Sequence, residues 1–265
     1  MPSASTPVPD PDPGAVPDTV IGKVMLILRA FDVDDHELTL AEIVRRTPLH
    51  KATAHRLARE LVDARLLDHT DSGYRLSGGL FELGMRASVE RSLLEIAMPF
   101  LQDLYARTRE TVHLGVLDGH EVLYVAKIGG HRQASAPSRT GGRMPLHCTG
   151  IGKALLAHAD PELRRQVLTA PLSRRAPRTI VAPGLLAAQL DTVLEAGVAF
   201  EFEESTIGIA CVAAPILEVA TNDVVAAVSV TGPLTRYRPE PHADAVRAAA
   251  SGIAATLHRR RALQS

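Results

Sequence analysis

Side chains that can contact DNA are concentrated in residues 39–56, near the N-terminus of a 265-residue chain. Arg and Lys can reach phosphates and the acceptor edge of guanine, and Thr can donate a hydrogen bond to a phosphate. Between residues 45 and 75, Lys and Arg outnumber Asp and Glu by seven to four, so the local excess of positive charge is modest. Taken one at a time, each cation is more simply explained as part of a solvated helix face. The residues predicted to contact DNA are Thr39, His50, Lys51, Thr53, His55 and Arg56.

Two short helices joined by a tight turn must position these side chains. Thr39 can cap a helix over residues 40–46, and Pro48 disfavours helical geometry at Thr47, which ends that helix. The spacing of apolar residues then predicts a second helix over residues 49–64. Its first two turns carry most of the candidate contacts.

A predicted hairpin directly follows the second helix. Residues 66–67 and 74–76 flank Asp71-Ser72-Gly73, whose residue types favour a tight turn. A hairpin added to two helices of this kind forms a wing, so the order of elements predicts a winged helix-turn-helix. The second helix of such a domain enters the major groove of double-stranded DNA. The N-terminus of the first helix, next to Thr39, offers further N–H groups to a phosphate.

A second group of candidate binding residues lies in the C-terminal half. Thr149-Gly150-Ile151-Gly152 opens a predicted helix over residues 150–160, where free backbone N–H groups and the helix dipole favour an anion. Ser229 and Thr231 alternate with valines in a predicted strand, which places both hydroxyls on one side. If that side lines a cavity, the hydroxyls can bind a ligand. Otherwise they satisfy backbone groups or water, which is the commoner outcome.

The motifs that could indicate an enzyme are incomplete. Residues 150–153 read Gly-Ile-Gly-Lys but lack two other residues of a phosphate-binding loop, so Lys153 is expected on a helix surface or capping a strand. Cys148 beside His147 has no orienting acid at a useful spacing, and Cys211 lies in an apolar run. Zinc-site spacing is absent among the histidines at 113, 120, 131 and 147. The sequence therefore indicates no catalytic residue and no cofactor, and nothing in it demands a metal.

Composition narrows the class of protein further. Hydrophobic residues make up 46% of the chain, which suits a packed core, and the formal net charge of −1 excludes a globally basic nucleic-acid binder. An aromatic content of 3% argues against stacking platforms for single-stranded nucleic acid. Two isolated cysteines fit a reducing compartment, and no stretch approaches the ~20 apolar residues of a membrane span. We expect a cytoplasmic protein without a membrane partner.

The first third of the chain contains a tail and a long helical stretch. Prolines with Ser, Thr and Asp over residues 1–18 predict a disordered tail, and helical spacing begins near Val20. After Gly78-Gly79, helical spacing runs to residue 108, with a kink or a new first turn expected at Pro99.

The second half alternates between strand and helix patterns. A hairpin is predicted around Asp118-Gly119, and Asn222-Asp223 supplies a later turn. Antiparallel hairpins with helices between them predict an α+β fold whose sheet is covered on one face. Beyond that hairpin, helices are expected at 150–160, 183–197 and 243–261, and strands at 198–204, 208–218 and 224–232.

From about Val20 to the last helix, the chain resembles the IclR family of bacterial regulators. The similarity rests on LTLAEIVRRTPLHKATAHRLARELVDARLL and YRLSGGLFELG, then on PLHCTGIGKALLA, GIACVAAPI and AAVSVTGP in this order. It implies a winged helix domain, a linker helix, and a GAF- or profilin-like α/β domain that binds an effector. It also implies repressors or activators that form homodimers through their N-terminal domains, usually paired into tetramers. The expected parts are a tail (1–18), the DNA-binding domain (19–77), the linker (78–92) and the effector domain (93–265).

The resemblance also implies a pocket for a small, anionic metabolite. Relatives often carry Asp where Glu201 stands, Ser where Thr231 stands and a smaller residue where Ile151 stands. The pocket should therefore be tighter, and the effector need not be a two- or three-carbon keto acid. Glu201 is thus the exception in a Glu-rich segment, residues 201–205, that is otherwise expected to be a solvated strand end or loop. The residues carried over are Met144, Gly150, Ile151, Glu201, Ile209, Cys211, Ser229 and Thr231.

Two other classes of protein remain open beside the favoured one, a ligand-responsive transcription regulator. A small-molecule enzyme with a structural N-terminal domain would need a nucleophile, a base and an orienting group, and no convincing set is present. An architectural DNA-binding protein would use its second domain only for oligomerisation and would bind no effector.

Overall fold

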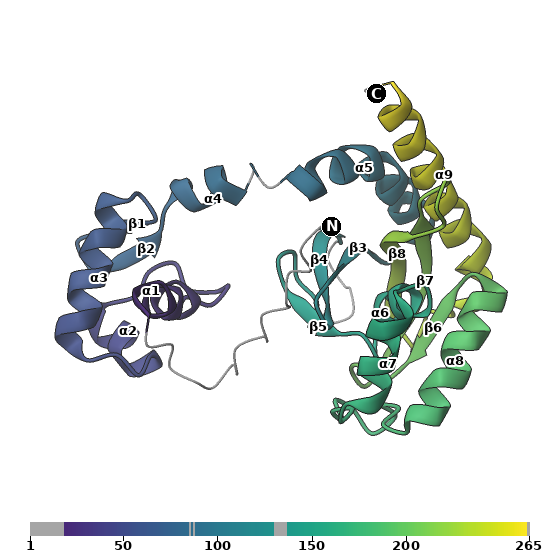
Figure 1. Ribbon diagram of the computed structural model, residues 1–265, viewed down its shortest axis with the longest axis horizontal. Coiled ribbons are helices and arrows are strands. Elements are labelled where there is room, and N and C mark those ends of the chain that lie inside the picture. Colours follow the sequence, from purple (N-terminus) through teal and green to yellow (C-terminus); the bar gives the residue numbers. More distant parts are fainter. Residues whose placement is uncertain (1–18, 85, 87, 130–136, 264–265) are drawn as a thin grey trace, which may run out of the picture. The chain divides into compact units, whose positions relative to one another are not determined.

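The computed structural model describes residues 19–84, 86, 88–129 and 137–263, and the chain divides into two compact units between Ser88 and Val89 (Figure 1). The tail predicted at residues 1–18 lies outside the described residues. Within the described part, no helix is long and apolar enough to cross a membrane.

The smaller unit contains a three-helix core and a two-stranded wing. Its apolar centre joins all three helices to the hairpin through Ile27, Ile43, Leu57 and Leu67, which are fully buried. The predicted winged helix-turn-helix is confirmed. Its elements are α1 (Val20–Arg29), α2 (Leu40–Arg46), α3 (Lys51–Asp63), β1 (Leu67–His69), β2 (Tyr74–Leu76) and α4 (Gly78–Gly84).

The turn between α2 and α3 forms because both of its ends are specified locally. Thr39 and Glu42 make a reciprocal capping box, in which the Thr39 hydroxyl accepts from the Glu42 N–H and the Glu42 carboxylate accepts from the Thr39 N–H. The Thr47 backbone is extended before Pro48, and its hydroxyl donates to the Ile43 carbonyl at 2.8 Å. These bonds orient α3 against α2.

The wing is fastened to the chain that precedes α2. The N–H of Leu38 donates to the Tyr74 carbonyl and the N–H of Tyr74 donates to the Leu38 carbonyl, each at 2.8 Å. A side chain at Gly73 would place its Cβ 2.3 Å from the Leu38 carbonyl oxygen, so only glycine permits this approach. The hairpin is therefore a fixed part of the unit.

Two helices replace the single long helical stretch that the sequence predicted. α4 ends at Gly84, a residue type that weakens helices, and α5 spans Ser88–Thr108. α5 continues through Pro99, which therefore does not begin a new helix. Because Pro99 is exposed, the carbonyl that loses its backbone partner to the proline ring can be hydrated.

The larger unit is built on a six-stranded antiparallel sheet in the order β5-β4-β3-β8-β7-β6 (Figure 1). Both predicted hairpin turns, Asp118-Gly119 and Asn222-Asp223, connect strands that pair in the sheet. The strands are β3 (Thr111–Asp118), β4 (Glu121–Ile128), β5 (Arg143–Pro145), β6 (Ala199–Phe202), β7 (Ile209–Leu217) and β8 (Val224–Pro233).

Helices cover both faces of this sheet, which corrects the prediction of one covered face. On one face, Leu101 of α5 and Ile253 of α9 pack with β-strand residues such as Val228. On the other face, Leu155 of α6 and Leu190 of α8 pack with alternate strand positions. The strands are near-continuous apolar runs for this reason. The helices are α6 (Gly150–Ala157), α7 (Pro161–Thr169), α8 (Pro183–Ala196) and α9 (Ala243–Ala262), with a 3₁₀ turn, η1 (Glu240–His242).

We predict that Gly152→Ala destabilises the larger unit. An added Cβ would lie 2.3 Å from the Leu146 carbonyl oxygen, and backbone must move to relieve this clash. Overpacking of this kind costs about 2 kcal/mol or more. Urea denaturation measures the loss. Gly184→Ala is the matched control, because nothing lies within 4 Å of its added Cβ in α8, and a loss of equal size there would contradict the steric explanation.

Candidate functional site

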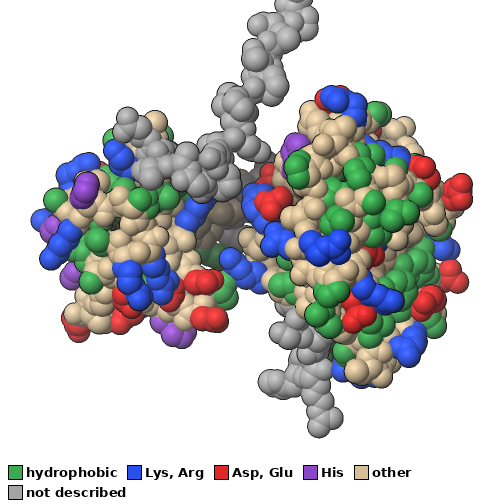
Figure 2. All heavy atoms as spheres, turned by 90° about the horizontal axis from the view of Figure 1, so that it is seen from below, with side chains coloured by type: hydrophobic (Ala, Val, Ile, Leu, Met, Phe, Trp, Pro, Cys, Tyr) green, Lys and Arg blue, Asp and Glu red, His purple; other side chains and the backbone are tan. Residues whose placement is uncertain are grey.

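The exposed face of α3 carries most of the residues predicted to contact DNA. Lys51, His55 and Arg56 are exposed and Thr53 is half-buried, whereas the opposite face is buried in the core of the smaller unit. His50 is the N-cap residue of α3, and its side chain makes no capping hydrogen bond, so the imidazole is available to a partner. Lys, Arg and His side chains stand out on the surface of this unit in Figure 2.

Two of the predicted contacts already have partners within the unit. The Arg56 guanidinium donates to Glu60 Oε1 at 2.5 Å, but both side chains are exposed, and such a pair contributes little stability and is easily exchanged. The Thr39 hydroxyl belongs to the capping box at the start of α2. Only the backbone N–H groups beside Thr39 therefore remain for a phosphate.

Arg59 is a candidate that the sequence-based selection left out. It lines a groove of about 420 Å³ with His55 on α3 and with His69 and Tyr74 on the wing. Within the described part of the chain, Arg59 has no ion-pair partner. Its spacing of four residues from His55 was the available signal, because residues i and i+4 share a helix face.

A small pocket, with a cavity volume of about 20 Å³, lies in the larger unit against the sheet face that α6 covers. The start of α6 and the strands β3, β4, β6, β7 and β8 all contribute residues to it. Seven of the eight residues predicted to bind an effector line this pocket, namely Met144, Gly150, Glu201, Ile209, Cys211, Ser229 and Thr231.

Ile151 is the predicted residue that does not line the pocket. Its side chain is buried in the apolar core between α6 and the sheet, where it lies against Gly115. Successive helix residues point about 100° apart, and here this rotation turns Ile151 into the core while Gly150 borders the pocket. The bulk of Ile151 therefore acts on the core.

Six further lining residues were missed by the sequence-based selection. Two of them, His113 and Tyr124, come from the β3–β4 hairpin, which was recognised as a hairpin but not as a neighbour of β8. His113 is the direct pairing partner of Ser229 across β3 and β8, and long-range pairing of this kind leaves no local signal. The six are His113, Tyr124, Pro137, Ser138, Thr149 and Ser205.

His113 supplies a neutral imidazole to the pocket. Complete burial, together with the positive charge of Lys127, lowers the pKa of His113 to about 3. Its Nε2 lies 2.8 Å from the Ser138 hydroxyl and its Nδ1 lies 3.5 Å from the Ser229 hydroxyl. The ring also makes an edge contact with Tyr124. A neutral His113 can both donate and accept hydrogen bonds.

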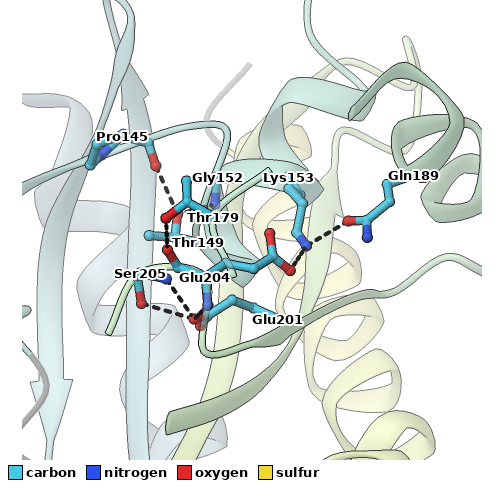
Figure 3. A network of polar contacts seen from close by, with 9 residues as sticks. All are labelled: Pro145, Thr149, Gly152, Lys153, Thr179, Gln189, Glu201, Glu204 and Ser205. Atoms are coloured by element: carbon cyan, nitrogen blue, oxygen red, sulfur yellow. Dashed lines mark hydrogen bonds and ion pairs between the residues drawn. The ribbon is translucent and has the colours of Figure 1, made fainter. Parts of the chain in front are cut away.

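Glu201 supplies a carboxyl group whose charge is finely balanced. Burial raises the pKa of Glu201 to about 7, although hydrogen bonds from Ser205 oppose this shift. One oxygen, Oε1, accepts from the N–H groups of Glu204 and Ser205 and from the Ser205 hydroxyl (Figure 3). Near neutral pH, the carboxyl can therefore be either a donor or an anion.

Two predictions about neighbouring charges are wrong. Lys153 is fully buried and ion-paired with Glu204, rather than lying on a helix surface. Glu204 is itself buried, so the prediction of a solvated segment is wrong at this residue: residues 201–202 end β6, and residues 203–205 form the turn that follows it.

The remaining polar groups of the pocket suit binding rather than catalysis. Burial raises the pKa of Cys211, which lines the pocket, and of Cys148, which does not, to about 12, so neither thiol is a ready nucleophile. Among the described residues, no cluster of His, Cys, Asp or Glu side chains is placed to hold a metal. The pocket offers neutral hydrogen-bonding groups to a small molecule.

A winged helix unit joined to an α/β unit with a buried polar pocket defines the class of ligand-responsive DNA-binding regulators. Comparison with known families then identifies the chain. The sequence model of the family "Bacterial transcriptional regulator IclR C-terminal" matches residues 85–255, and that of the "IclR helix-turn-helix domain" matches residues 20–71. The chain belongs to the IclR family, and is a transcriptional regulator, not an enzyme.

Individual relatives agree with this assignment. The chain is 35% identical to the HTH-type transcriptional regulator BhcR of Paracoccus denitrificans, over 81% of this chain and 80% of BhcR. It is 33% identical to KdgR of Escherichia coli, over 84% of this chain and 86% of KdgR. An IclR homologue of Microbacterium hydrocarbonoxydans, crystallised with 4-hydroxybenzoate, has a TM-score of 0.84 and 34% identity, over 91% of this chain and all of that one.

Proposed function

We propose that a small carboxylic acid binds in the pocket of the larger unit and thereby controls the binding of operator DNA by α3. The observation that carries this proposal is the convergence of hydroxyl groups, the Glu201 carboxyl and the start of α6 on one enclosed space. The cavity between these groups measures about 20 Å³, about the space of one water molecule, so the lining side chains would have to move apart to admit the acid.

The chemistry of the lining favours an acid with an apolar body. Gly150 is the first residue of α6, so its N–H has no partner within the helix and can donate to a carboxylate. Ser229 and Thr231 offer hydroxyl donors, while Met144 and Ile209 offer apolar contact. The 4-hydroxybenzoate bound by the Microbacterium relative has this combination of groups, and we take it as the first compound to test.

On the DNA side, we assign α3 to the major groove. Lys51 would neutralise a phosphate, and His55 and Arg59 lie where the groove between α3 and the wing can receive the backbone. Arg56 would leave its ion pair with Glu60 and bind a DNA phosphate instead. Ala52, exposed between these side chains, leaves room for close approach to base edges. A DNA partner in the bacterial chromosome would place the protein in the cytoplasm.

A second copy of the chain is proposed to cover an apolar surface of the smaller unit. Several large apolar side chains of α1 and α4 are exposed on this unit, and a dimer interface would remove them from water. They are Val20, Ile21, Met25, Phe81 and Leu83. A symmetric dimer would bury them twice and would pair two α3 helices on one operator. We further propose pairing of such dimers into tetramers.

The proposed parts of the chain are a DNA-binding domain (19–77), a linker (78–92) and an effector domain (93–265). α5 begins at the boundary between the two compact units and packs on the sheet through Leu93, Ile96 and Leu101. We propose that the effector acts on the spacing of the paired α3 helices through this linker.

We predict that 4-hydroxybenzoate raises the melting temperature of the protein, because a ligand that binds only the native state stabilises it. Affinity should be highest below about pH 7 and should fall as pH rises, since a bound carboxylate requires the protonated form of Glu201 and the pKa of Glu201 is raised to about 7. Calorimetric titration from pH 5.5 to 8.5 measures this dependence. In Glu201→Gln the dependence should vanish, whereas Glu162→Gln on α7 should retain it. An affinity that rises with pH would exclude this mode of binding.

We predict that Lys51→Ala weakens operator binding and lowers the slope of log affinity against log salt by about one, because one phosphate contact is lost. Fluorescence anisotropy across a salt series measures both quantities. Arg165→Ala, which removes one charge from α7 in the larger unit, is the matched control and should leave the slope unchanged. Equal slopes for the wild type and Lys51→Ala would remove Lys51 from the contact surface.

We predict that Ile21→Asp converts the dimer into monomers, because a carboxylate cannot be buried against an apolar partner. Ile21 is 76% exposed in the isolated chain, so the substitution should not unfold the unit. Ile207→Asp is the control in the larger unit, where Ile207 is 67% exposed. Sedimentation equilibrium gives the mass of each variant. A dimeric Ile21→Asp protein would locate the interface elsewhere.

A further inference from the structure

A lysine side chain lies fully enclosed in the middle of α6. Lys153 is 0% exposed, and its ammonium donates to Glu204 Oε1 at 2.5 Å and to Gln189 Oε1 at 2.7 Å (Figure 3). Burying an ion pair costs desolvation energy, and the attraction between the two charges barely offsets this cost. Well-packed apolar side chains at these two positions would therefore stabilise α6 at least as well. Stability therefore does not explain why a charged pair stands here.

The turn that carries Glu204 also holds Glu201 at the pocket. The N–H groups of Glu204 and Ser205 donate to Glu201 Oε1 at 3.1 and 3.0 Å, and the Ser205 hydroxyl donates to it at 2.9 Å. The Thr179 hydroxyl donates to the Glu204 carbonyl at 2.6 Å. Within the described part of the chain, no donor reaches Oε2 of Glu201, so this second oxygen remains for a ligand.

The same turn contains a backbone conformation that needs support. Glu203 has a φ of 59°, in the left-handed region that is strained for a residue with a side chain. The Glu203 carboxylate accepts from the Gly208 N–H at 2.8 Å, and Lys153 anchors the neighbouring Glu204. Loss of the anchor at Glu204 would therefore let the turn relax and move Glu201.

The charges that Glu201 faces are those of this ion pair. The other titratable groups around it stay neutral near pH 7, because burial lowers the pKa of the histidines and raises that of the tyrosine and the thiols. These groups are His113 on β3, Tyr124 on β4, His147 and Cys148 before α6, and Cys211 on β7. The Glu204 carboxylate raises the pKa of Glu201, and the Lys153 ammonium lowers it.

We propose that Lys153 and Glu204 are positioning residues, whose ion pair fixes the place and the charge of the Glu201 carboxyl without either side chain lining the pocket. The consequence of this ion pair for effector binding rests on the proposed function. Its effect on the Glu201 carboxyl is independent of that function and can be measured in the protein without a ligand.

The direct test follows the Glu201 carboxyl by ¹³C NMR in the full-length protein labelled at glutamate side chains, with Glu201→Gln used for assignment. Lys153→Met should raise the pKa of Glu201 and Glu204→Gln should lower it, each by about one unit, since a neighbouring charge is removed in each case. Arg178→Met is the matched control, because it breaks an exposed pair with Glu203 on the same turn. The control should leave the titration unchanged. Shifts in the same direction, or none, would overturn the proposal.

A double variant separates positioning from folding. Each single variant leaves one buried group without its partner, whereas Lys153→Met with Glu204→Leu removes both charges and should fold. In this variant the pKa of Glu201 should stay near that of the wild type, yet the affinity for 4-hydroxybenzoate should fall about tenfold because the turn is no longer anchored. An unfolded double variant, or one with wild-type affinity, would assign the pair to stability alone. If 4-hydroxybenzoate does not bind the wild type, the proposed effector class fails, and the NMR titration still decides the role of the ion pair.

Discussion

The register of the antiparallel sheet is the constraint on which the binding pocket depends. Thr231 on β8 pairs with both Thr111 and Cys211, and Cys211 pairs with Glu201, so one polar row crosses four strands. A slip of one residue would turn every side chain of a strand to the opposite face. The apolar residues that pack against α5 and α9 on that face prevent such a slip. The apolar core therefore fixes the register that places this polar row on the opposite face of the sheet.

Local signals in the sequence predicted the structural features that depend on residues close together along the chain. The cap at Thr39, the stop at Thr47-Pro48 and the alternation around Ser229 each act within a few residues, and each element formed where it was expected. The prediction of one helix continuing past Gly84 was wrong. The helical spacing of apolar residues continues beyond this glycine, although α4 ends there. The near-continuous apolar runs of β7 and β8 did signal that both sheet faces are covered, and the prediction of one covered face followed the hairpin turns instead of this signal.

Contacts between distant segments were beyond such reasoning. Lys153 and Glu204 are 51 residues apart, and each alone resembles a solvated surface charge. Only the docking of α6 beside the turn after β6 makes them partners. His113 likewise became a pocket residue through its pairing with Ser229. The family resemblance correctly predicted that Gly150 lines the pocket, but it also included Ile151. A resemblance transfers positions in a sequence, whereas the rotation of the helix points the next side chain in another direction.

The alternation of strand residues also gives the pocket a physical connection to α5. His113 faces the pocket, while Val112 and Leu114 on either side of it pack in the core that contains Leu101 of α5. A ligand that displaces β3 through the His113 side chain would press Val112 and Leu114 against that helix, because a densely packed core transmits displacement. Such a movement changes DNA binding only if the ligand binds one arrangement of α5 more tightly than the other. A pocket of neutral hydrogen-bonding groups, with one carboxyl whose pKa lies near 7, can supply this difference in affinity. Small shifts in the geometry of the pocket decide whether each donor meets an acceptor.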